Sequence, residues 1–184
     1  MPTRAVFLDR DGTLIVEKNY LHKPEEVVIY PGSAEALRRL TEAGYLIIMI
    51  TNQSGVGRGY FTLEDVNRVH SYINGELAKG GARIEKIYIA PEAPDKPSRG
   101  RKPSPQFLFD ARDEFEIGLG QSFMIGDKLI DLECGWNAGV ARSILVRTGY
   151  GAKVEHEPGV EKALVVDNLA AAADWILAQE GGHR

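Results

Sequence analysis

The stretch AVFLDRDGTL, residues 5–14, decides how the rest of the chain is interpreted. Its apolar run 6–8 is typical of a buried strand, and this run leads directly into two aspartates, Asp9 and Asp11. Because alternate side chains of a strand share one face, the two carboxylates could point the same way. Neighbouring carboxylates repel each other unless a cation or a reaction uses them. The pair is therefore either an ordinary acidic turn or the edge of a reaction site.

The composition is that of an ordinary globular protein. The chain has 184 residues, of which 43% are hydrophobic and 26% charged, and its net charge is −4. We expect one domain spanning residues 1–184, and the negative charge argues against a nucleic-acid partner. The single cysteine, Cys134, fits a reducing cytoplasm. The apolar runs are too short to span a bilayer and no signal peptide is evident, so we expect a cytoplasmic protein without a membrane partner. We also expect a monomer.

Short apolar runs alternate with longer amphipathic stretches along the chain. This alternation predicts an α/β fold in three layers, with a mostly parallel, Rossmann-like sheet covered by helices on both faces. We expect Ser33 and Thr62 to be helix N-caps and Pro105 to be a first helical residue. The expected strands cover residues 6–8, 45–50, 84–90, 121–125, 141–146 and 163–166, and the expected helices cover 33–44, 62–80, 104–115, 129–138 and 168–178.

The connections are too short for a large cap domain. Segments 14–30 and 54–61 have room only for small lids. Residues 91–103 contain four prolines and no apolar periodicity, so they predict a loop.

Polar residues follow four of the expected strands. Ligands of such sheets bind beyond the carboxyl ends of the strands, so these four groups should meet at one edge. The residues concerned are Asp9 and Asp11 after the first strand, Thr51, Asn52 and Gln53 after the second, Arg101 and Lys102 after the third, and Gly126, Asp127 and Lys128 after the fourth, with Asp131 one turn later.

The residue types in these groups suit phosphate chemistry. Carboxylates such as Asp9, Asp11 and Asp127 are ligands for Mg²⁺, which binds one or two of them together with water and a substrate phosphate. Thr51, the amides that follow it, and Lys102 can donate hydrogen bonds to phosphate oxygens. The combination predicts phosphoryl transfer.

In order along the chain, these groups resemble the four motifs of the haloacid dehalogenase (HAD) superfamily of phosphohydrolases. Four longer stretches resemble one branch, the D-glycero-D-manno-heptose 1,7-bisphosphate phosphatases and the related histidinol-phosphate phosphatases. They are FLDRDGT, TNQSGVGRGYFT (residues 51–62), RKPSP (101–105) and GDKLIDLECGWNAG (126–139).

The resemblance implies a hydrolysis of phosphomonoesters through an aspartyl phosphate. Asp9 would attack phosphorus, and Asp11 would act as general acid and then general base. Mg²⁺ would be held by the carboxylates of Asp9 and Asp127 and the backbone carbonyl of Asp11. The transferring oxygens would be held by Thr51, Asn52 and Lys102.

Other residues receive supporting roles from the same resemblance. Gly12 would allow a sharp turn, and Thr13 could orient Asp11. Gln53 and Arg58 join the expected substrate-binding residues, and Arg101 would bind the second phosphate of a bisphosphate. Residues 91–103, which contain Arg101, would then form a substrate loop. Lys128 and Asp131 either support the site or form a structural ion pair with each other.

The chain departs from the branch at a zinc loop that many members have. That loop holds two pairs of ligands, and the aligned positions here are Ala90 with Glu92 and Ser98 with Gly100. Apart from the Glu92 carboxylate, none of these is a usual zinc ligand. We therefore predict no structural zinc.

Three other functions remain open beside the leading hypothesis, a Mg²⁺-dependent removal of the 7-phosphate from the heptose bisphosphate. One is a phosphatase for histidinol phosphate or for another small sugar phosphate, although a cationic substrate such as histidinol phosphate would prefer acidic contacts to Arg101. Another is a phosphatase that has lost its specificity. The third is a phosphate-sensing module without catalysis, which would not need an acid–base residue such as Asp11.

Overall fold

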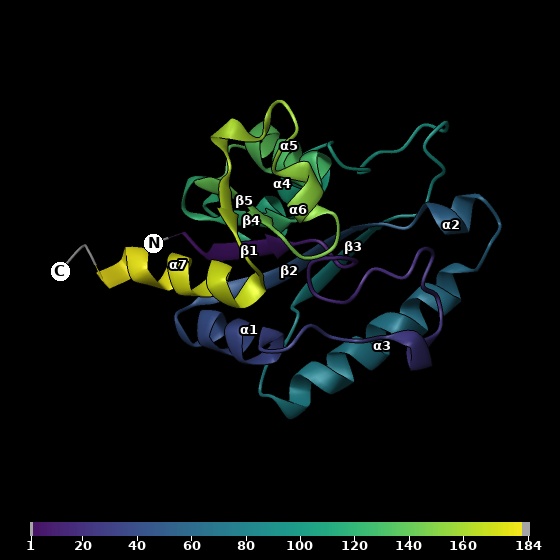
Figure 1. The fold of residues 1–184 in the computed structure, drawn as a ribbon, viewed down its shortest axis with the longest axis horizontal. Helices are drawn as coiled ribbons and strands as arrows, with labels where there is room; N and C mark the ends of the chain where they lie inside the picture. Colours follow the sequence, from purple (N-terminus) through teal and green to yellow (C-terminus); the bar gives the residue numbers. More distant parts are fainter. Residues whose placement is uncertain (1, 182–184) are drawn as a thin grey trace.

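A parallel sheet runs through the computed structural model, which describes residues 2–181 (Figure 1). The strand order is β3-β2-β1-β4-β5-β6, and every neighbouring pair is parallel, as the alternation of elements predicts. The strands are β1 (Arg4–Leu8), β2 (Tyr45–Asn52), β3 (Lys86–Ala90), β4 (Phe123–Gly126), β5 (Arg142–Val146) and β6 (Leu164–Val166).

Helices cover both faces of this sheet, so the three-layer prediction is confirmed. In Figure 1, α1, α3 and α7 lie on one side of the strands, and α4 and α5 lie on the other. The helices are α1 (Ser33–Glu42), α2 (Ser54–Gly57), α3 (Leu63–Lys79), α4 (Gln106–Phe115), α5 (Leu129–Ala138), α6 (Gly151–Val154) and α7 (Leu169–Gly181), and 3₁₀ turns occupy Pro24–Glu26, Leu119–Gln121 and Val160–Lys162.

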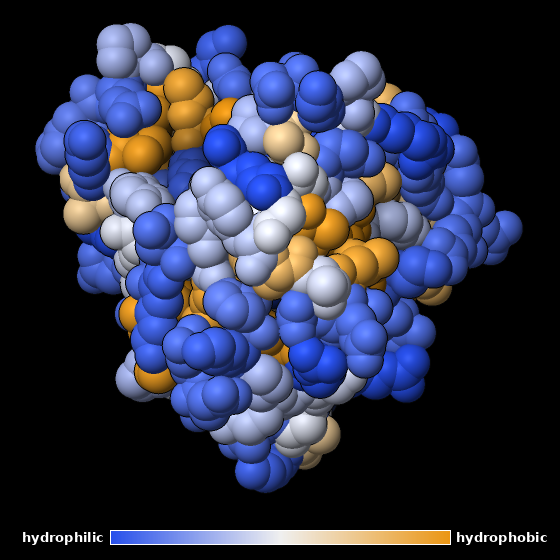
Figure 2. Space-filling view, turned by 90° about the vertical axis from the view of Figure 1, so that its right-hand side faces the viewer, coloured by the Kyte–Doolittle hydropathy of each residue, from blue (hydrophilic) through white to orange (hydrophobic). Residues whose placement is uncertain are grey.

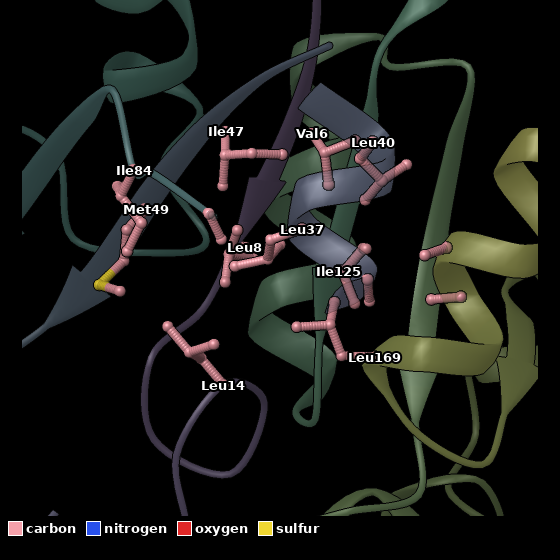
Figure 3. Close-up of a cluster of buried hydrophobic side chains, with 14 of the residues drawn as sticks. Val6, Leu8, Leu14, Leu37, Leu40, Ile47, Met49, Ile84, Ile125 and Leu169 are labelled. Atoms are coloured by element: carbon pink, nitrogen blue, oxygen red, sulfur yellow. The ribbon is translucent and has the colours of Figure 1, made fainter. Parts of the chain in front are cut away.

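The two faces of the sheet follow the twofold alternation of its strands. On one face, Val6 and Leu8 of β1 belong to the same buried cluster as Leu37 and Leu40 of α1 (Figure 3). The intervening Phe7 belongs to a second cluster on the other face, together with residues of α4 and α5. Because β1 is covered on both sides, its last four residues, Ala5 to Leu8, are all apolar and buried.

Several predicted element boundaries are wrong by one or two residues. Gly32, not Ser33, is the N-cap of α1, and α4 begins at Gln106 with Pro105 as its N-cap. The third strand begins at residue 86 rather than 84. Thr62 is confirmed as the N-cap of α3, where its hydroxyl accepts a hydrogen bond from Asp65 N–H at 3.1 Å.

The start of the fourth strand is also corrected, from residue 121 to Phe123. Ser122 closes the preceding 3₁₀ turn, because its hydroxyl donates to Gly118 O at 2.8 Å. The same oxygen accepts from Ala5 N–H at 3.0 Å. These bonds hold the chain in a turn next to β1, so that β4 begins only at Phe123.

The path of the chain brings the ends of β1 and β4 together. Residues up to β3 build one half of the sheet, and β4 then returns to the opposite side of β1. Parallel sheets bind ligands at such a reversal of strand order, beyond the carboxyl ends. Among the described residues, no helix is long and apolar enough to cross a membrane.

Candidate active site

A cleft of about 220 Å³ opens at the carboxyl ends of β1, β2 and β4. Figure 2 views the molecule from the right-hand side of Figure 1, where α2 lies, and its surface is mostly hydrophilic with orange residues gathered in a few hollows. The cleft is lined by Asp9, Arg10, Asp11, Glu17, Asn19, Tyr20, Leu21, Asn52, Gln53, Ser54, Gly55, Phe61, Lys102, Lys128, Ile130, Asp131 and Tyr150.

Lys102 joins two buried carboxylates at the base of this cleft. Its Nζ lies 2.6 Å from Asp9 Oδ1 and 2.7 Å from Asp131 Oδ1, and it also donates to Ile50 O at 2.9 Å. Burial alone would lower the pKa of Lys102, but the charges of Asp131 and Asp9 together raise this pKa above its ordinary value. Lys102 is therefore a fixed cation between the two carboxylates.

Asp127 lies beside Asp9 and is fully buried. Its Oδ2 accepts a hydrogen bond from Tyr150 N–H at 2.9 Å, whereas its Oδ1 has no partner among the described residues. Burial, followed by the charge of Asp9, raises the pKa of Asp127 to about 8. Burial likewise raises the pKa of Asp9 to about 6, against the opposing charge of Lys102. The two carboxylates therefore need a further cation to be ionised together.

The donor set fits a divalent metal ion. Carboxylate oxygens of Asp9, Asp127 and Asp131 lie within 4.8 Å of one another, and no other such group occurs among residues 2–181. Oxygen ligands of this kind suit Mg²⁺. Since Asp131 is already bound to Lys102, Asp9 and Asp127 are the carboxylates left for the ion.

Gly12 permits the close approach of the β1 loop to Asp127. Its φ is +83°, and a Cβ atom at this position would lie 2.2 Å from Asp127 Oδ2. Only glycine combines this left-handed conformation with the missing side chain. The predicted turn role of Gly12 is thus accompanied by a packing role beside the carboxylate.

Asp11 is held by two neighbours that the sequence analysis did not assign to it. Arg10 binds it twice, with Nε 2.8 Å from Oδ2 and Nη2 3.1 Å from Oδ1, and Gln53 Nε2 donates to Oδ2 at 3.1 Å. Burial would raise the pKa of Asp11, but the charge and hydrogen bonds of Arg10 outweigh it and lower this pKa. The prediction that Thr13 orients Asp11 is wrong, because Thr13 Oγ1 has no hydrogen-bond partner among the described residues.

Gln53 connects Asp11 with the end of β2. Its Nε2 also donates to Thr51 Oγ1 at 2.7 Å, and its Oε1 accepts from Arg10 Nη2 at 3.1 Å. Asn52 instead holds the backbone of Lys102, accepting from its N–H at 3.0 Å and donating to its carbonyl at 3.3 Å. The amide side chains after β2 therefore position the acidic and basic groups of the cleft.

The question left open about Lys128 and Asp131 is resolved against an ion pair between them. Asp131 Oδ2 accepts from the backbone N–H of Lys128 at 3.0 Å, as an N-terminal cap of α5, while its other oxygen faces Lys102. The Lys128 Nζ lies 3.9 Å from Glu17 and 4.9 Å from the ring centroid of Tyr150. Asp131 therefore caps α5 through the backbone of Lys128 and does not pair with the Lys128 side chain.

Arg58 and Arg101 lie outside the lining of the cleft. Arg101 is half-buried, with Nη1 3.4 Å from Glu92 O, and Arg58 is exposed. Burial, followed by the nearby charge of Arg58, lowers the pKa of Arg101. The two guanidinium groups thus form a local concentration of positive charge.

Sequence reasoning missed the buried network behind Asp11. Arg10 is 1% exposed, and its Nη1 lies 3.2 Å from His70 Nε2. Arginine is seldom buried unless it is paired, and the two flanking aspartates were the available signal. His70 gave no such signal, because it lies in α3, 60 positions along the chain from Arg10.

The fold and the carboxylate pair after β1 define a HAD-like phosphohydrolase. A family model described as HAD-hydrolase-like matches residues 100–172, and one described as polynucleotide kinase 3 phosphatase matches residues 4–130. The D-glycero-D-manno-heptose-1,7-bisphosphate 7-phosphatase of Thermosynechococcus vestitus is 36% identical, with 96% of each chain covered. The corresponding enzyme of Chlorobaculum tepidum is 41% identical, with 80% of each covered.

Solved structures agree with these relatives. The D,D-heptose 1,7-bisphosphate phosphatase of B. bronchiseptica, complexed with magnesium and phosphate, superposes with a TM-score of 0.90 at 33% identity, covering 96% of this chain and 99% of that one. The enzyme of Burkholderia thailandensis has a TM-score of 0.74 at 34% identity, with coverages of 95% and 99%. The chain belongs to the HAD-like phosphatase family that contains these heptose-bisphosphate 7-phosphatases.

Proposed function

We propose that this enzyme removes the 7-phosphate of D-glycero-D-manno-heptose 1,7-bisphosphate with the help of Mg²⁺. The relatives that share most of its length carry this activity in their names. The observation that carries the proposal is the arrangement of Asp9 between the cation Lys102 and the unpartnered oxygen of Asp127. A nucleophile (Asp9), a fixed positive charge (Lys102) and a metal ligand (Asp127) then surround the place where the phosphate to be transferred would bind.

Asp9 acts as the nucleophile in this proposal. One of its carboxylate oxygens attacks phosphorus, the bond to the sugar oxygen breaks, and an aspartyl phosphate forms. Lys102 neutralises negative charge at this centre throughout, because it is already in contact with Asp9 at 2.6 Å. Thr51, at the end of β2, contributes a hydroxyl to the phosphate oxygens.

Asp11 transfers the proton in both half-reactions. As an acid it protonates the leaving alkoxide, and as a base it takes a proton from the water that hydrolyses the aspartyl phosphate. Its bonds with Arg10 and Gln53 favour the ionised carboxylate, which is the form required in the second half-reaction. Substrate binding must therefore favour the protonated form for the first.

Mg²⁺ would be held by the carboxylates of Asp9 and Asp127 and by the backbone carbonyl of Asp11. The ion supplies positive charge that reduces the repulsion between the carboxylates and the phosphate. The orphaned Oδ1 of Asp127 supports this assignment.

The second phosphate would bind near Arg101 and Arg58. Two guanidinium groups close to each other repel, and an anion with two or more negative charges relieves that repulsion. The substrate loop offers little for a zinc ion, since Glu92 accepts a hydrogen bond from Ser98 Oγ at 2.7 Å. We retain the expectations of a zinc-free, monomeric and cytoplasmic enzyme, which metal analysis, sedimentation and cell fractionation would test.

A steady-state screen with Mg²⁺ tests the proposed substrate. The panel contains the heptose 1,7-bisphosphate in both anomers, fructose 1,6-bisphosphate, histidinol phosphate and an aryl phosphate. We expect the largest kcat/KM for the heptose bisphosphate, with the 1-phosphate retained in the product. A preference for histidinol phosphate would contradict the proposal, and no phosphate release from any member would favour the sensing module.

The Arg101→Gln variant tests the subsite for the second phosphate. We expect a rise in KM for the heptose bisphosphate and little change for the aryl phosphate, which has no second phosphate. Arg112→Gln, an exposed arginine of α4 paired with Asp113, is the matched control.

A further inference from the structure

Two consecutive residues at the mouth of the cleft have an unfavourable backbone conformation. Asn19 has a φ of 43° and Tyr20 a φ of 63°, and neither is glycine. Asparagine tolerates the left-handed region, but an aromatic residue seldom adopts it. Such conformations persist only where the surroundings enforce them, and they concentrate at functional sites.

Contacts on both sides enforce this conformation. Asn19 N–H donates to Glu17 Oε1 at 2.8 Å, and His22 Nδ1 lies 2.9 Å from Tyr20 O. Two ring pairs then join segment 14–30 to segment 54–61. The Tyr20 and Tyr60 rings form a T-shaped pair with centroids 4.9 Å apart and planes at 87°, and His22 stacks on Phe61 at 5.1 Å and 9°.

The strained turn places an aromatic ring in the lining of the cleft. Tyr20 lines the same cleft as Asp9, yet it remains 39% exposed although its ring is large and apolar. Its partner Tyr60 follows Arg58 by two residues in segment 54–61. The ring thus lies in the cleft that holds the reacting centre and packs against the segment that carries one of the two arginines assigned to the second phosphate.

We propose that Tyr20, supported by its T-shaped contact with Tyr60, is a specificity-determining residue whose ring packs against the carbon skeleton of the phosphorylated sugar. The inference rests on the proposed function in taking a sugar phosphate as substrate. An exposed aromatic face contacts C–H groups well, and its rigid placement lowers the entropy lost on binding. The ring then favours substrates that extend from the cleft toward Arg101 over shorter phosphomonoesters.

The test compares two substrates in three variants. The ratio of kcat/KM for the heptose 1,7-bisphosphate to that for β-glycerol phosphate, whose three-carbon skeleton offers the ring much less to contact, measures the contribution of Tyr20. We expect Tyr20→Leu to lower this ratio about tenfold, mainly through KM, because an aromatic contact of this kind has about that effect. Tyr20→Phe should retain the ratio within about twofold, since it keeps the ring. Tyr60→Leu, which removes the supporting ring, should lower the ratio by a smaller factor.

Tyr72→Leu is the matched control, because Tyr72 is an exposed tyrosine of α3 that does not line the cleft. An unchanged ratio in Tyr20→Leu overturns the inference. An equal fall for both substrates also overturns it, since that result indicates distortion of the reacting centre. If wild-type enzyme hydrolyses fructose 1,6-bisphosphate instead of the heptose bisphosphate, the proposed function fails, and the same ratio measured with the fructose compound still tests Tyr20.

Discussion

The Nζ atom of Lys102 lies 2.6 Å from Oδ1 of Asp9, although the two residues are 93 positions apart in the chain. Both side chains are almost completely buried. This ion pair joins the end of β1 to the substrate loop before α4, and Asp131 of α5 completes it from the other side. The reacting carboxylate is therefore positioned by the packing of three elements.

Replacing Lys102 by methionine should destabilise the fold as well as abolish turnover. The substitution leaves Asp9, Asp127 and Asp131 buried together without their cation, and we expect a loss of about 3 kcal/mol in the free energy of unfolding. Urea unfolding without metal measures this loss. Lys128→Met is the control, because Lys128 is partly exposed and has only a 3.9 Å ion pair. Equal stability losses in the two variants would contradict the assigned role of Lys102.

Alanine at Gly12 separates the conformational role of this residue from its packing role. We expect Gly12→Ala to cost about 3 kcal/mol of stability, from the left-handed φ and from overlap with Asp127. Gly139→Ala is the control, since Gly139 has a φ of +77° with no atom within 4 Å of the added Cβ, and it should cost about 1 kcal/mol. Thermal or urea unfolding compares them. Similar costs would show that contact with Asp127 is unimportant.

His70 should make stability fall in mild acid. Burial, followed by the charge of Arg10, lowers the pKa of His70 to about 3. Between this value and the unfolded value of about 6.5, the unfolded chain binds the extra proton, so stability decreases as pH falls below about 6.5. The contribution at pH 5 is about 2 kcal/mol relative to pH 8. The raised pKa values of Asp9 and Asp127 act in the opposite direction, so each variant is compared with the wild type. We expect the change in stability from pH 8 to pH 5 to be about 2 kcal/mol less unfavourable in His70→Gln than in the wild type, and unaltered in the exposed-residue control His156→Gln. The same pH dependence in His70→Gln and the wild type would contradict the burial argument.

Asp9→Asn should abolish turnover, because an amide cannot form the aspartyl phosphate. Phosphate release from the heptose bisphosphate measures this, after mass spectrometry has excluded deamidation back to aspartate. Wild-type activity in an intact asparagine variant would be incompatible with the assigned nucleophile.

The residues that meet at this edge of the sheet could be predicted because each lies at the end of a strand. Asp9, Thr51 and Asp127 come directly at the ends of apolar runs, and parallel strands bring such positions to one edge. The resemblance to the HAD superfamily added a further argument, because the four groups occur in the same order along the chain as the four motifs of that superfamily. The same reasoning found the sheet and most helices, since their apolar periodicity reflects which faces are covered.

The pairing of side chains could not be predicted in the same way. The residue type of Lys102 predicts a contact with phosphate. Its contact with Asp131 is not predicted, because that contact depends on how α5 packs against the sheet. The resemblance predicts that Thr13 orients Asp11, whereas in the structure Arg10 binds the Asp11 carboxylate and Thr13 Oγ1 has no partner among the described residues. The strained turn at Tyr20 likewise depends on ring contacts with a distant segment. These relationships arise only after the elements have packed.

The most direct test of the central claim uses the Asp11→Asn variant, which should form the aspartyl phosphate but hydrolyse it slowly. The variant is mixed with the heptose bisphosphate and Mg²⁺, quenched in acid, digested and mapped by mass spectrometry. We predict one added phosphoryl group on the peptide that contains Asp9, at a time when free phosphate is still scarce. Free phosphate released without any phosphorylated Asp9, or a phosphoryl group on another residue, would contradict the account.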